Sequence, residues 1–267
     1  MNAATIERRW RRHTPAERLA RFAIWLTCVA ALVWSVRNVE IIPEFLFDAH
    51  VQMADLLRRM WPPDLAYYPR TVHGALIETI HIATLGTILS LVMAVPVGLL
   101  AARNITPFRI LNDLAKLILV ASRSVNSLVW ALLFVAVFGP GALAGTIAIA
   151  FRSVGFVGKL FAEAVEESGR GPVEALRASG ASWPAIWLKG YWPQVQPAFW
   201  SIALFRWDIN VRESAVLGLV GAGGIGLVLD TAMNFFQWTR VATVLIAIFA
   251  VVVIAEIVVT QIRKRLI

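Results

Sequence analysis

The stretch from Ile82 to Ala102 contains no charged residue. A helix needs about 20 mostly apolar residues to cross the hydrocarbon core of a bilayer, so this stretch is long enough to span a membrane. The rest of the chain has the same character, since 58% of its 267 residues are hydrophobic and its mean hydropathy is +0.69. This composition lies outside the range of soluble globular domains. The sequence therefore predicts an all-α integral membrane protein that crosses the bilayer several times.

Six stretches reach or approach the length and apolarity of a membrane-spanning helix. The first is the weakest, because Arg37 and Glu40 lie near its outer end, and the second is expected to bend at Pro96. A basic segment precedes the first stretch, as in a signal peptide, but no small-residue cleavage site follows, so we expect this stretch to remain as the first span. The predicted spans are residues 22–42, 76–102, 115–138, 141–165, 198–228 and 240–261.

The lysine and arginine residues indicate which ends of these spans face the cytoplasm. They accumulate before the first span, between the second and third, in the loop that contains Glu174, and at the C-terminus. Because positive residues are enriched in cytoplasmic loops, these regions and both termini are expected on the cytoplasmic side. In the outer loop, Phe45 to Met60 is expected to form a helix along the membrane surface, as a lipid anchor or as a contact for a solute-delivering protein. We therefore divide the chain into a basic N-terminal segment (1–21), a first span with its outer loop (22–70) and a main transmembrane domain (71–267).

A polar loop, residues 170–197, lies between two strongly apolar regions. Gly171 and Pro172 are expected to open a short helix that carries Glu174 in its first turn, where a negative charge suits the helix dipole. Gly180 is expected to cap the C-terminus of this helix.

A second short helix is expected in the same loop, from Ser182 as N-cap with Pro184 in its first turn to a stop at Gly190 and Pro193. The chain would then turn back toward the membrane at Pro197. A segment this polar cannot be buried in lipid and has no core of its own, so its expected use is to dock on another protein. An ordinary amphipathic cytoplasmic loop is the alternative.

The spacing within this loop resembles the cytoplasmic coupling loop of ABC importer permeases. In that family Glu-Ala-Ala is followed by Gly four positions after the second Ala, and by Pro thirteen positions beyond that Gly. The matching residues are Glu174, Ala175, Gly180 and Pro193. The sequence departs from the family where Leu176 replaces the second Ala, and where Gly190 and Trp192 stand in place of Ile and Leu. The resemblance implies that the loop docks on a cytoplasmic ATPase subunit.

Residues 78–104, 152–167 and 210–226 resemble the permease subunit of phosphonate-type ABC importers, within a similarity that starts at about residue 71. This resemblance implies the type I importer architecture and a bacterial cytoplasmic membrane. It also implies a second permease copy, two ATPase subunits that bind ATP and Mg, an extracytoplasmic solute-binding protein, and no cofactor in this chain itself. The implied substrate is a phosphonate, phosphate or phosphite. The resemblance does not distinguish among these three oxyanions. It also does not distinguish a homodimer from a heterodimer with a paralogue.

Arginines lie close to the middle of three predicted spans, at Arg123, Arg152 and Arg212. An arginine that faces lipid at that depth costs about 2.5–3.5 kcal/mol on insertion scales, so these side chains are expected to face the bundle interior or a water-filled path. In one interpretation they are structural and pair with carboxylates such as Asp208 and Glu213 or with backbone carbonyls. In the other they line the route of an anionic solute, because a guanidinium matches the oxygens of phosphate or phosphonate. Only those two acids lie nearby in the sequence, which favours the anion path, and we place Ser214 on it as well.

Glycines cluster near the outer end of the fifth predicted span, at Gly221, Gly223, Gly224 and Gly226. The pattern fits GxGxxG, but that fingerprint indicates dinucleotide binding only between a strand and a helix of a soluble βαβ unit. In an apolar helix, small residues allow close packing or break the helix. We expect one of these roles here, and a hinge or gate is the functional alternative.

The sequence contains no Walker A motif, no HExxH motif, no cysteine–histidine cluster and no nucleophile elbow. We therefore predict no catalytic or metal site, and no ATP hydrolysis by this chain. The net charge of +8 falls mainly at membrane edges and does not indicate nucleic-acid binding. The alternatives left open are a permease for another small solute, a passive anion channel, and a membrane-embedded enzyme that acts on a lipid or phosphate ester.

Overall fold

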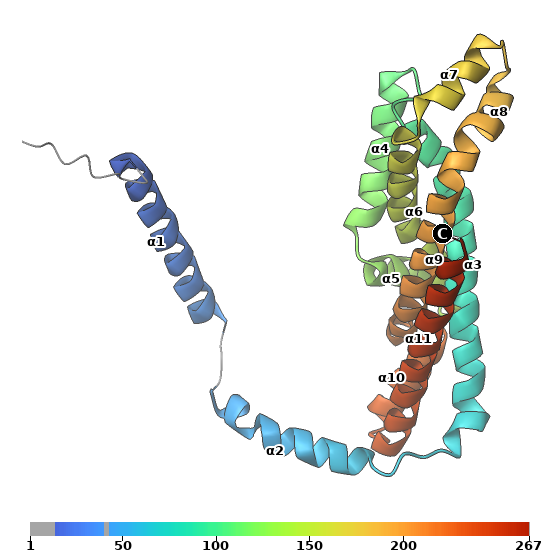
Figure 1. Ribbon diagram of the computed structural model, residues 1–267. Coiled ribbons are helices and arrows are strands. Elements are labelled where there is room, and N and C mark those ends of the chain that lie inside the picture. The colour runs from blue at the N-terminus through green and yellow to red at the C-terminus, as the bar shows by residue number, and fades with distance from the viewer. Residues whose placement is uncertain (1–13, 40–42, 267) are drawn as a thin grey trace, which may run out of the picture. The chain divides into compact units, whose positions relative to one another are not determined.

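The computed structural model of the protein describes residues 14–39 and 43–266 (Figure 1). Within these ranges every regular element is a helix, as the sequence predicts. The chain divides into two compact units, of which the first ends at Leu56 and the second begins at Leu57. The elements are α1 (Pro15–Asn38), α2 (Pro43–Met60), η1 (Tyr68–Val72), α3 (His73–Ala101), α4 (Arg109–Ser124), α5 (Ser127–Phe138), α6 (Ala142–Glu166), α7 (Arg170–Ala178), α8 (Trp183–Ile186), η2 (Trp187–Tyr191), α9 (Trp192–Leu217), η3 (Gly218–Val220), α10 (Ile225–Asn234) and α11 (Trp238–Leu266).

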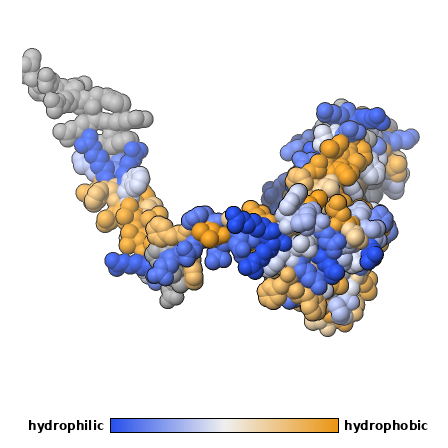
Figure 2. Space-filling view, turned by 90° about the horizontal axis from the view of Figure 1, so that it is seen from below, coloured by the Kyte–Doolittle hydropathy of each residue, from blue (hydrophilic) through white to orange (hydrophobic). Residues whose placement is uncertain are grey.

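Helix α1 corresponds to the first predicted span, although it begins earlier, at Pro15. A capping box fixes this start: the Thr14 hydroxyl accepts from the Glu17 backbone N–H, and the Glu17 carboxylate accepts from the Thr14 backbone N–H. Apolar side chains cover much of the α1 surface and are exposed (Figure 2). Glu40 and the predicted end of this span lie outside the described residues. Helix α2 confirms the helix predicted for Phe45 to Met60, whereas its place along the membrane surface stays a prediction.

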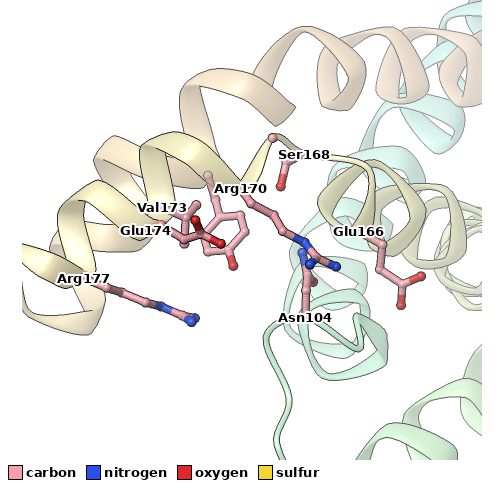
Figure 3. Close-up of a pocket in the computed structure, with 9 residues that line it drawn as sticks. Asn104, Glu166, Ser168, Arg170, Val173, Glu174 and Arg177 are labelled. Carbon is pink, nitrogen blue, oxygen red and sulfur yellow. The ribbon is translucent and has the colours of Figure 1, made fainter.

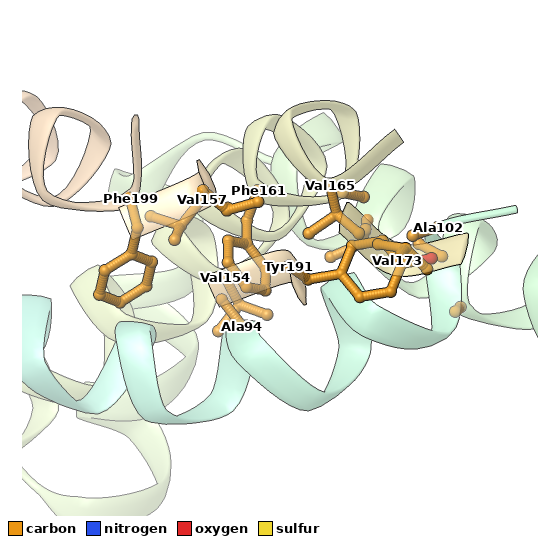
Figure 4. Close-up of a cluster of buried hydrophobic side chains, with 14 of the residues drawn as sticks. Ala94, Ala102, Val154, Val157, Phe161, Val165, Val173, Tyr191 and Phe199 are labelled. Atoms are coloured by element: carbon orange, nitrogen blue, oxygen red, sulfur yellow. The ribbon is translucent and has the colours of Figure 1, made fainter. Parts of the chain in front are cut away.

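Helix α6 lies at the centre of the second unit, where it packs against α3, α4, α5 and α9. The largest buried cluster gathers at one end of this unit and draws residues from several of these helices (Figure 4). Phe161 of α6 is fully buried there, and its ring lies 5.5 Å from that of Phe199 of α9 in an edge-to-face arrangement. The same cluster includes Val173 of α7, so the polar loop packs against the core of the bundle.

Glycines let α4 approach α6 closely. A Cβ at Gly155 would lie 2.4 Å from the Leu119 carbonyl oxygen, and one at Gly158 would lie 2.6 Å from the Leu119 side chain. Small residues let the backbones of two membrane helices approach closely, and van der Waals packing between them then stabilises the contact. The position of α4 therefore depends on the absence of a side chain at these two glycines.

Gly155→Ala is expected to destabilise the folded protein by about 1–3 kcal/mol, because the added Cβ would meet a backbone oxygen that no rotamer change can move. This loss should appear despite the better helix propensity of alanine, which favours the variant by about 1 kcal/mol. Gly74→Ala on α3 is the matched control, since nothing lies within 4 Å of a Cβ at that position. Thermal unfolding in nanodiscs measures both variants, and equal midpoints would contradict the packing role of Gly155.

Four helices of the described residues are long and apolar enough to cross a bilayer, and two bent pairs raise the number to six if each pair is one span. The predicted third span, 115–138, is such a pair, because α4 and α5 meet at an angle of 90°. Val125 is extended between them, and the Asn126 side chain caps α5 by accepting from the Leu128 N–H. The fifth predicted span is also broken, with a bend of 42° before α10.

Candidate functional site

Helix α7 forms the first part of the polar loop at the end of the unit drawn uppermost in Figure 1. Gly180 caps it with a left-handed φ of +74°. The Gly180 N–H donates to the Arg177 carbonyl and the Ala181 N–H donates to the Leu176 carbonyl, which together make a Schellman motif. The predicted cap is confirmed. The predicted place of Glu174 is wrong: the helix begins at Arg170, so Glu174 lies in its second turn and not its first.

The second half of the loop does not stop where the sequence analysis expects. Ser182 precedes α8 as its N-cap residue, but the helix continues through the π-helical turn η2 into α9 without a break at Gly190 or Pro193. In this wider turn the Trp192 N–H donates to the Trp187 carbonyl, five residues back. Pro193 follows this wider turn directly, and Pro197 lies inside the same helix. The loop thus leads directly into a membrane helix.

Two contacts fix α7 against this continuous helix. Val173 is buried against Gly190, whose missing side chain leaves room for it. The Gln194 side chain accepts from the Gly169 N–H at 2.8 Å, and its amide donates to the Gly190 carbonyl at 2.6 Å and to the Gly169 carbonyl at 3.3 Å. These contacts tie the start of α7 to the first turn of α9, so the two helices are held together as one body.

The side of α7 that carries Val173 also carries charges of both signs. Arg170, Glu174 and Arg177 are exposed and border a pocket of about 280 Å³ (Figure 3). Ala175 is exposed on the same short helix, whereas Pro193 is exposed at the start of α9. The structure therefore brings Glu174, Ala175 and Gly180 onto one exposed element at one end of the bundle.

A carboxylate shared by two arginines lies between α6 and α9. Glu213 accepts from Arg152 of α6 through one oxygen and from Arg206 of its own helix through the other, the latter at 3.2 Å. The Arg206 side chain is only 4% exposed, and that of Glu213 is 18% exposed. The sequence analysis missed Arg206, although a charged residue inside the predicted span 198–228 was a signal that could have found it.

Further hydrogen bonds continue from this group into the bundle. Arg206 Nε donates to the Ser153 hydroxyl at 2.8 Å, Ser153 donates to the Asn210 side-chain oxygen at 3.2 Å, and the Asn210 amide donates to the Thr87 hydroxyl at 2.8 Å. The chain of polar groups joins α9 to α6 and then to α3. Ser214 lies farther along α9, fully buried, with its hydroxyl hydrogen-bonded to the Thr79 and Val211 carbonyls. Ser214 is therefore buried in the bundle in this conformation, and its place on the substrate path stays a prediction.

The three arginines singled out in the sequence do not meet at one site. Arg212 pairs with Asp208 at 2.5 Å and, more loosely, with Glu256 of α11 at 3.7 Å. Arg152 and Arg212 line one open pocket of about 330 Å³. Arg123, on the last turn of α4, lines a different pocket. Folding brings a third acid, the distant Glu256, to Arg212, so Arg152 and Arg212 each lie beside a carboxylate, whereas no salt bridge joins Arg123 to one among the described residues. The place of these arginines on an anion path stays a prediction.

The glycine cluster breaks the fifth predicted span. Gly221, Gly223 and Gly224 have positive φ angles, and α9 ends through the short turn η3 before α10 begins at Ile225. A Cβ at Gly226 would lie 2.3 Å from the Ala215 carbonyl oxygen, so α10 also folds back closely against the end of α9. Both expected structural roles, a helix break and close packing, are confirmed. A hinge or gate at these glycines stays a prediction.

Comparison with known proteins places these features in a family. Residues 94–267 match the family described as binding-protein-dependent transport system inner membrane component. The chain belongs to this family. It is 37% identical over 247 residues to the phosphite transport system permease protein PtxC of Stutzerimonas stutzeri, which covers 92% of this chain and 89% of that protein. It is 36% identical over 236 residues to the phosphate-import permease protein PhnE of Mycolicibacterium smegmatis, which covers 88% of this chain and 44% of that protein.

A solved structure shares the fold of this permease. The inward-facing MetNI methionine ABC transporter aligns with a TM-score of 0.64 at 22% identity, over 73% of this chain and 96% of that chain. The predicted type I importer permease architecture is thereby confirmed. The relatives are transport permease subunits, so the chain is a membrane-embedded permease rather than a member of an enzyme family.

Proposed function

We propose that this permease imports a phosphorus oxyanion, namely phosphite, phosphate or a phosphonate, in an ATP-driven transporter. The observation that carries this proposal is the 37% identity to a phosphite transport permease over 92% of the chain. The similarity to a phosphate-import permease points to the same class of anion, because both substrates present tetrahedral phosphorus with charged oxygens. A permease for another small solute is the runner-up.

Membership of this family supports a proposed assembly. In the proposed transporter two permease chains, either identical or paralogous, stand side by side, two ATPase subunits bind ATP and Mg on the cytoplasmic side, and a solute-binding protein delivers the anion from outside. The accumulation of lysine and arginine in the polar loop and at both termini supports a cytoplasmic location for α7. The exposed charges on α7, Arg170, Glu174 and Arg177, are suited to a protein contact there. No cofactor is assigned to this chain.

The continuity of the polar loop with α9 suggests how ATP hydrolysis acts on the membrane part. A displacement of α7 by the ATPase would pass to α9, because Gln194 and Val173 hold the two together. Helix α9 carries Glu213, whereas Arg152 lies on α6, so relative motion of these helices would open the ion pair. The broken helix at Gly221 to Gly224 would absorb part of this motion as a hinge.

Arg152 is the arginine best suited to meet the anion. It lines the open pocket, its side chain is 29% exposed, and its Nε has no hydrogen-bond partner among the described residues. When Glu213 moves away, its guanidinium would offer paired donors to a phosphorus oxyanion. Arg212 borders the same pocket and is 47% exposed.

The function is tested by reconstituting the permease with its candidate ATPase and binding protein and measuring uptake of phosphate, phosphite, several phosphonates and sulfate. We expect uptake of at least one phosphorus oxyanion, strictly dependent on ATP and on the binding protein, and none of sulfate. Flux without ATP would instead show a passive channel, and turnover of a lipid or phosphate ester would show an enzyme. Uptake of none of the phosphorus compounds would contradict the proposed substrate class.

Arg152→Gln is expected to lower this uptake roughly tenfold or more, because a hydrogen bond to a charged group is worth about 1.5–3 kcal/mol. Glu213 would keep its second partner, Arg206, so the permease should remain folded. Arg70→Gln, a change of the same kind at an exposed residue of η1, is the control. Uptake by the Arg152 variant at the level of this control would remove Arg152 from the anion path.

A further inference from the structure

A second basic site lies in the membrane bundle, apart from the shared carboxylate. It is a pocket of about 390 Å³ between the C-terminal end of α3, the middle of α4 and the last turns of α6, here called the α4 pocket. Its cationic lining residues are Arg103, Lys116, Arg123 and Lys159. Lys116 and Arg123 are seven residues apart, which puts them on the same face of α4 two turns from each other.

The positive charge of the α4 pocket is only partly balanced. Lys159 pairs with Glu163 at 3.4 Å, and Glu166 accepts a hydrogen bond from the Arg103 backbone N–H at 2.7 Å. In the part of the chain that the structure describes, no salt bridge joins the side chain of Arg103, Lys116 or Arg123 to a carboxylate. This pocket thus differs from the one at Arg152, where each arginine faces an acid.

The α4 pocket also has apolar lining residues beside its two carboxylates, Glu163 and Glu166. Leu119 and Val120 of α4 and Ala162 of α6 line the same pocket, and Leu117, Ile118 and Val120 expose large apolar surfaces on α4. Arg103, Arg123 and Lys159 are exposed and Lys116 is half-buried, so an anion can reach them from outside the bundle. Cations around one pocket repel one another, and a bound anion lowers this repulsion.

The walls of the α4 pocket are also held in place. Leu119 is buried, and its backbone and side chain lie against Gly155 and Gly158 of α6. The Ser122 hydroxyl on α4 donates to the Phe151 carbonyl of α6 and accepts from the Gly155 N–H. Lys116, Arg123 and Lys159 therefore project from a fixed pair of helices, and Arg103 joins them from the turn that follows α3.

We propose that the α4 pocket binds a phosphate-type oxyanion group, either the headgroup of an anionic phospholipid or a free phosphorus oxyanion. Both sources offer several charged oxygens to the cations, and lysine and arginine between membrane helices suit such a group. A lipid would place its acyl chains along the exposed apolar side chains of α4, whereas a free anion would occupy only the basic end. The inference depends on this pocket alone and not on the proposed transport function.

The test uses the full-length permease in nanodiscs and has two arms. In the lipid arm, nanodiscs contain equal amounts of phosphatidylglycerol and phosphatidylcholine, and native mass spectrometry counts the phosphatidylglycerol retained. In the free-anion arm, nanodiscs contain phosphatidylcholine alone, and equilibrium binding of radiolabelled inorganic phosphate is measured. The variant is Lys116→Gln with Arg123→Gln, the charge-conserving variant is Lys116→Arg with Arg123→Lys, and the control is Lys264→Gln with Arg265→Gln on exposed residues of α11.

We expect the glutamine pair to weaken binding roughly thirtyfold in one arm, the equivalent of about 1 kcal/mol for each of two cations. The charge-conserving variant and the α11 control should bind like the unaltered protein. An effect confined to the lipid arm would identify a lipid headgroup, and one confined to the phosphate arm would identify a free anion. Binding in neither arm, or equal binding by the glutamine pair and the α11 control, would overturn the proposal.

Discussion

Replacing Glu213 with glutamine is expected to destabilise the folded permease by about 3–5 kcal/mol, the largest effect of any single change considered. Removal of one partner from a buried ion pair leaves the other charge uncompensated, and this costs far more than the pair itself contributes. Here the charge left behind is Arg206, whose side chain is 4% exposed and pairs with no second carboxylate among the described residues. Arg152 would lose the same partner.

The size of this effect distinguishes the shared carboxylate from an ordinary ion pair. Asp208→Asn removes the partner of Arg212, whose side chain is 47% exposed, so it should cost only about 1 kcal/mol or less. Glu213→Gln combined with Arg206→Gln should recover part of the loss, because the buried Arg206 charge is then no longer left without its carboxylate. Unfolding of the purified permease in mixed micelles measures all three. Equal stability of the Glu213 and Asp208 variants would contradict the structural importance of the shared carboxylate.

Glu174→Lys is expected to abolish most ATP-driven uptake while leaving the permease inserted and folded. Glu174 is exposed on α7 and makes no contact that holds this helix to the bundle, which depends instead on Val173 and Gln194. If α7 docks on the ATPase, a reversed charge at the contact costs about 2–5 kcal/mol, or roughly thirtyfold or more in affinity. Uptake and co-purification of the ATPase with the permease are the measurements.

The control for this charge reversal is Asp113→Lys. Asp113 is also exposed, but it lies on α4 rather than α7. The Asp113→Lys variant should lower uptake and ATPase retention only slightly. If both variants transport normally, or both lose the ATPase equally, the contact does not involve α7 specifically.

The parts of this fold that depend on local sequence could be predicted from it. The apolar stretches give the long helices, and the cap of α7 follows from Gly180, because a left-handed residue after a helix is most easily a glycine. The spacing of Glu174, Ala175 and Gly180 was enough to indicate a family to which the chain does belong. These signals extend over a few residues and need no knowledge of the tertiary structure.

The parts that depend on distant contacts could not be predicted in this way. Glu256 lies 44 positions after Arg212 in the numbering, and only folding of α11 against α9 brings them to 3.7 Å. The 90° bend between α4 and α5 is different, because it falls at the polar residues Ser124, Asn126 and Ser127, a local signal that the predicted third span passed over. Continuity through Gly190 and Pro193 was missed because the π-helical turn accommodates residues that usually end a helix.

The central claim is that α7 faces the cytoplasm and touches an ATPase subunit. Cys28 is the single cysteine of the chain, so a Cys28→Ser background allows one new cysteine to be placed at the exposed Ala175. In the assembled transporter, Ala175→Cys is predicted to cross-link to the ATPase subunit, and in intact cells it should resist a membrane-impermeant maleimide. Labelling of that cysteine from outside the cell, with no cross-link to the ATPase, would contradict the account.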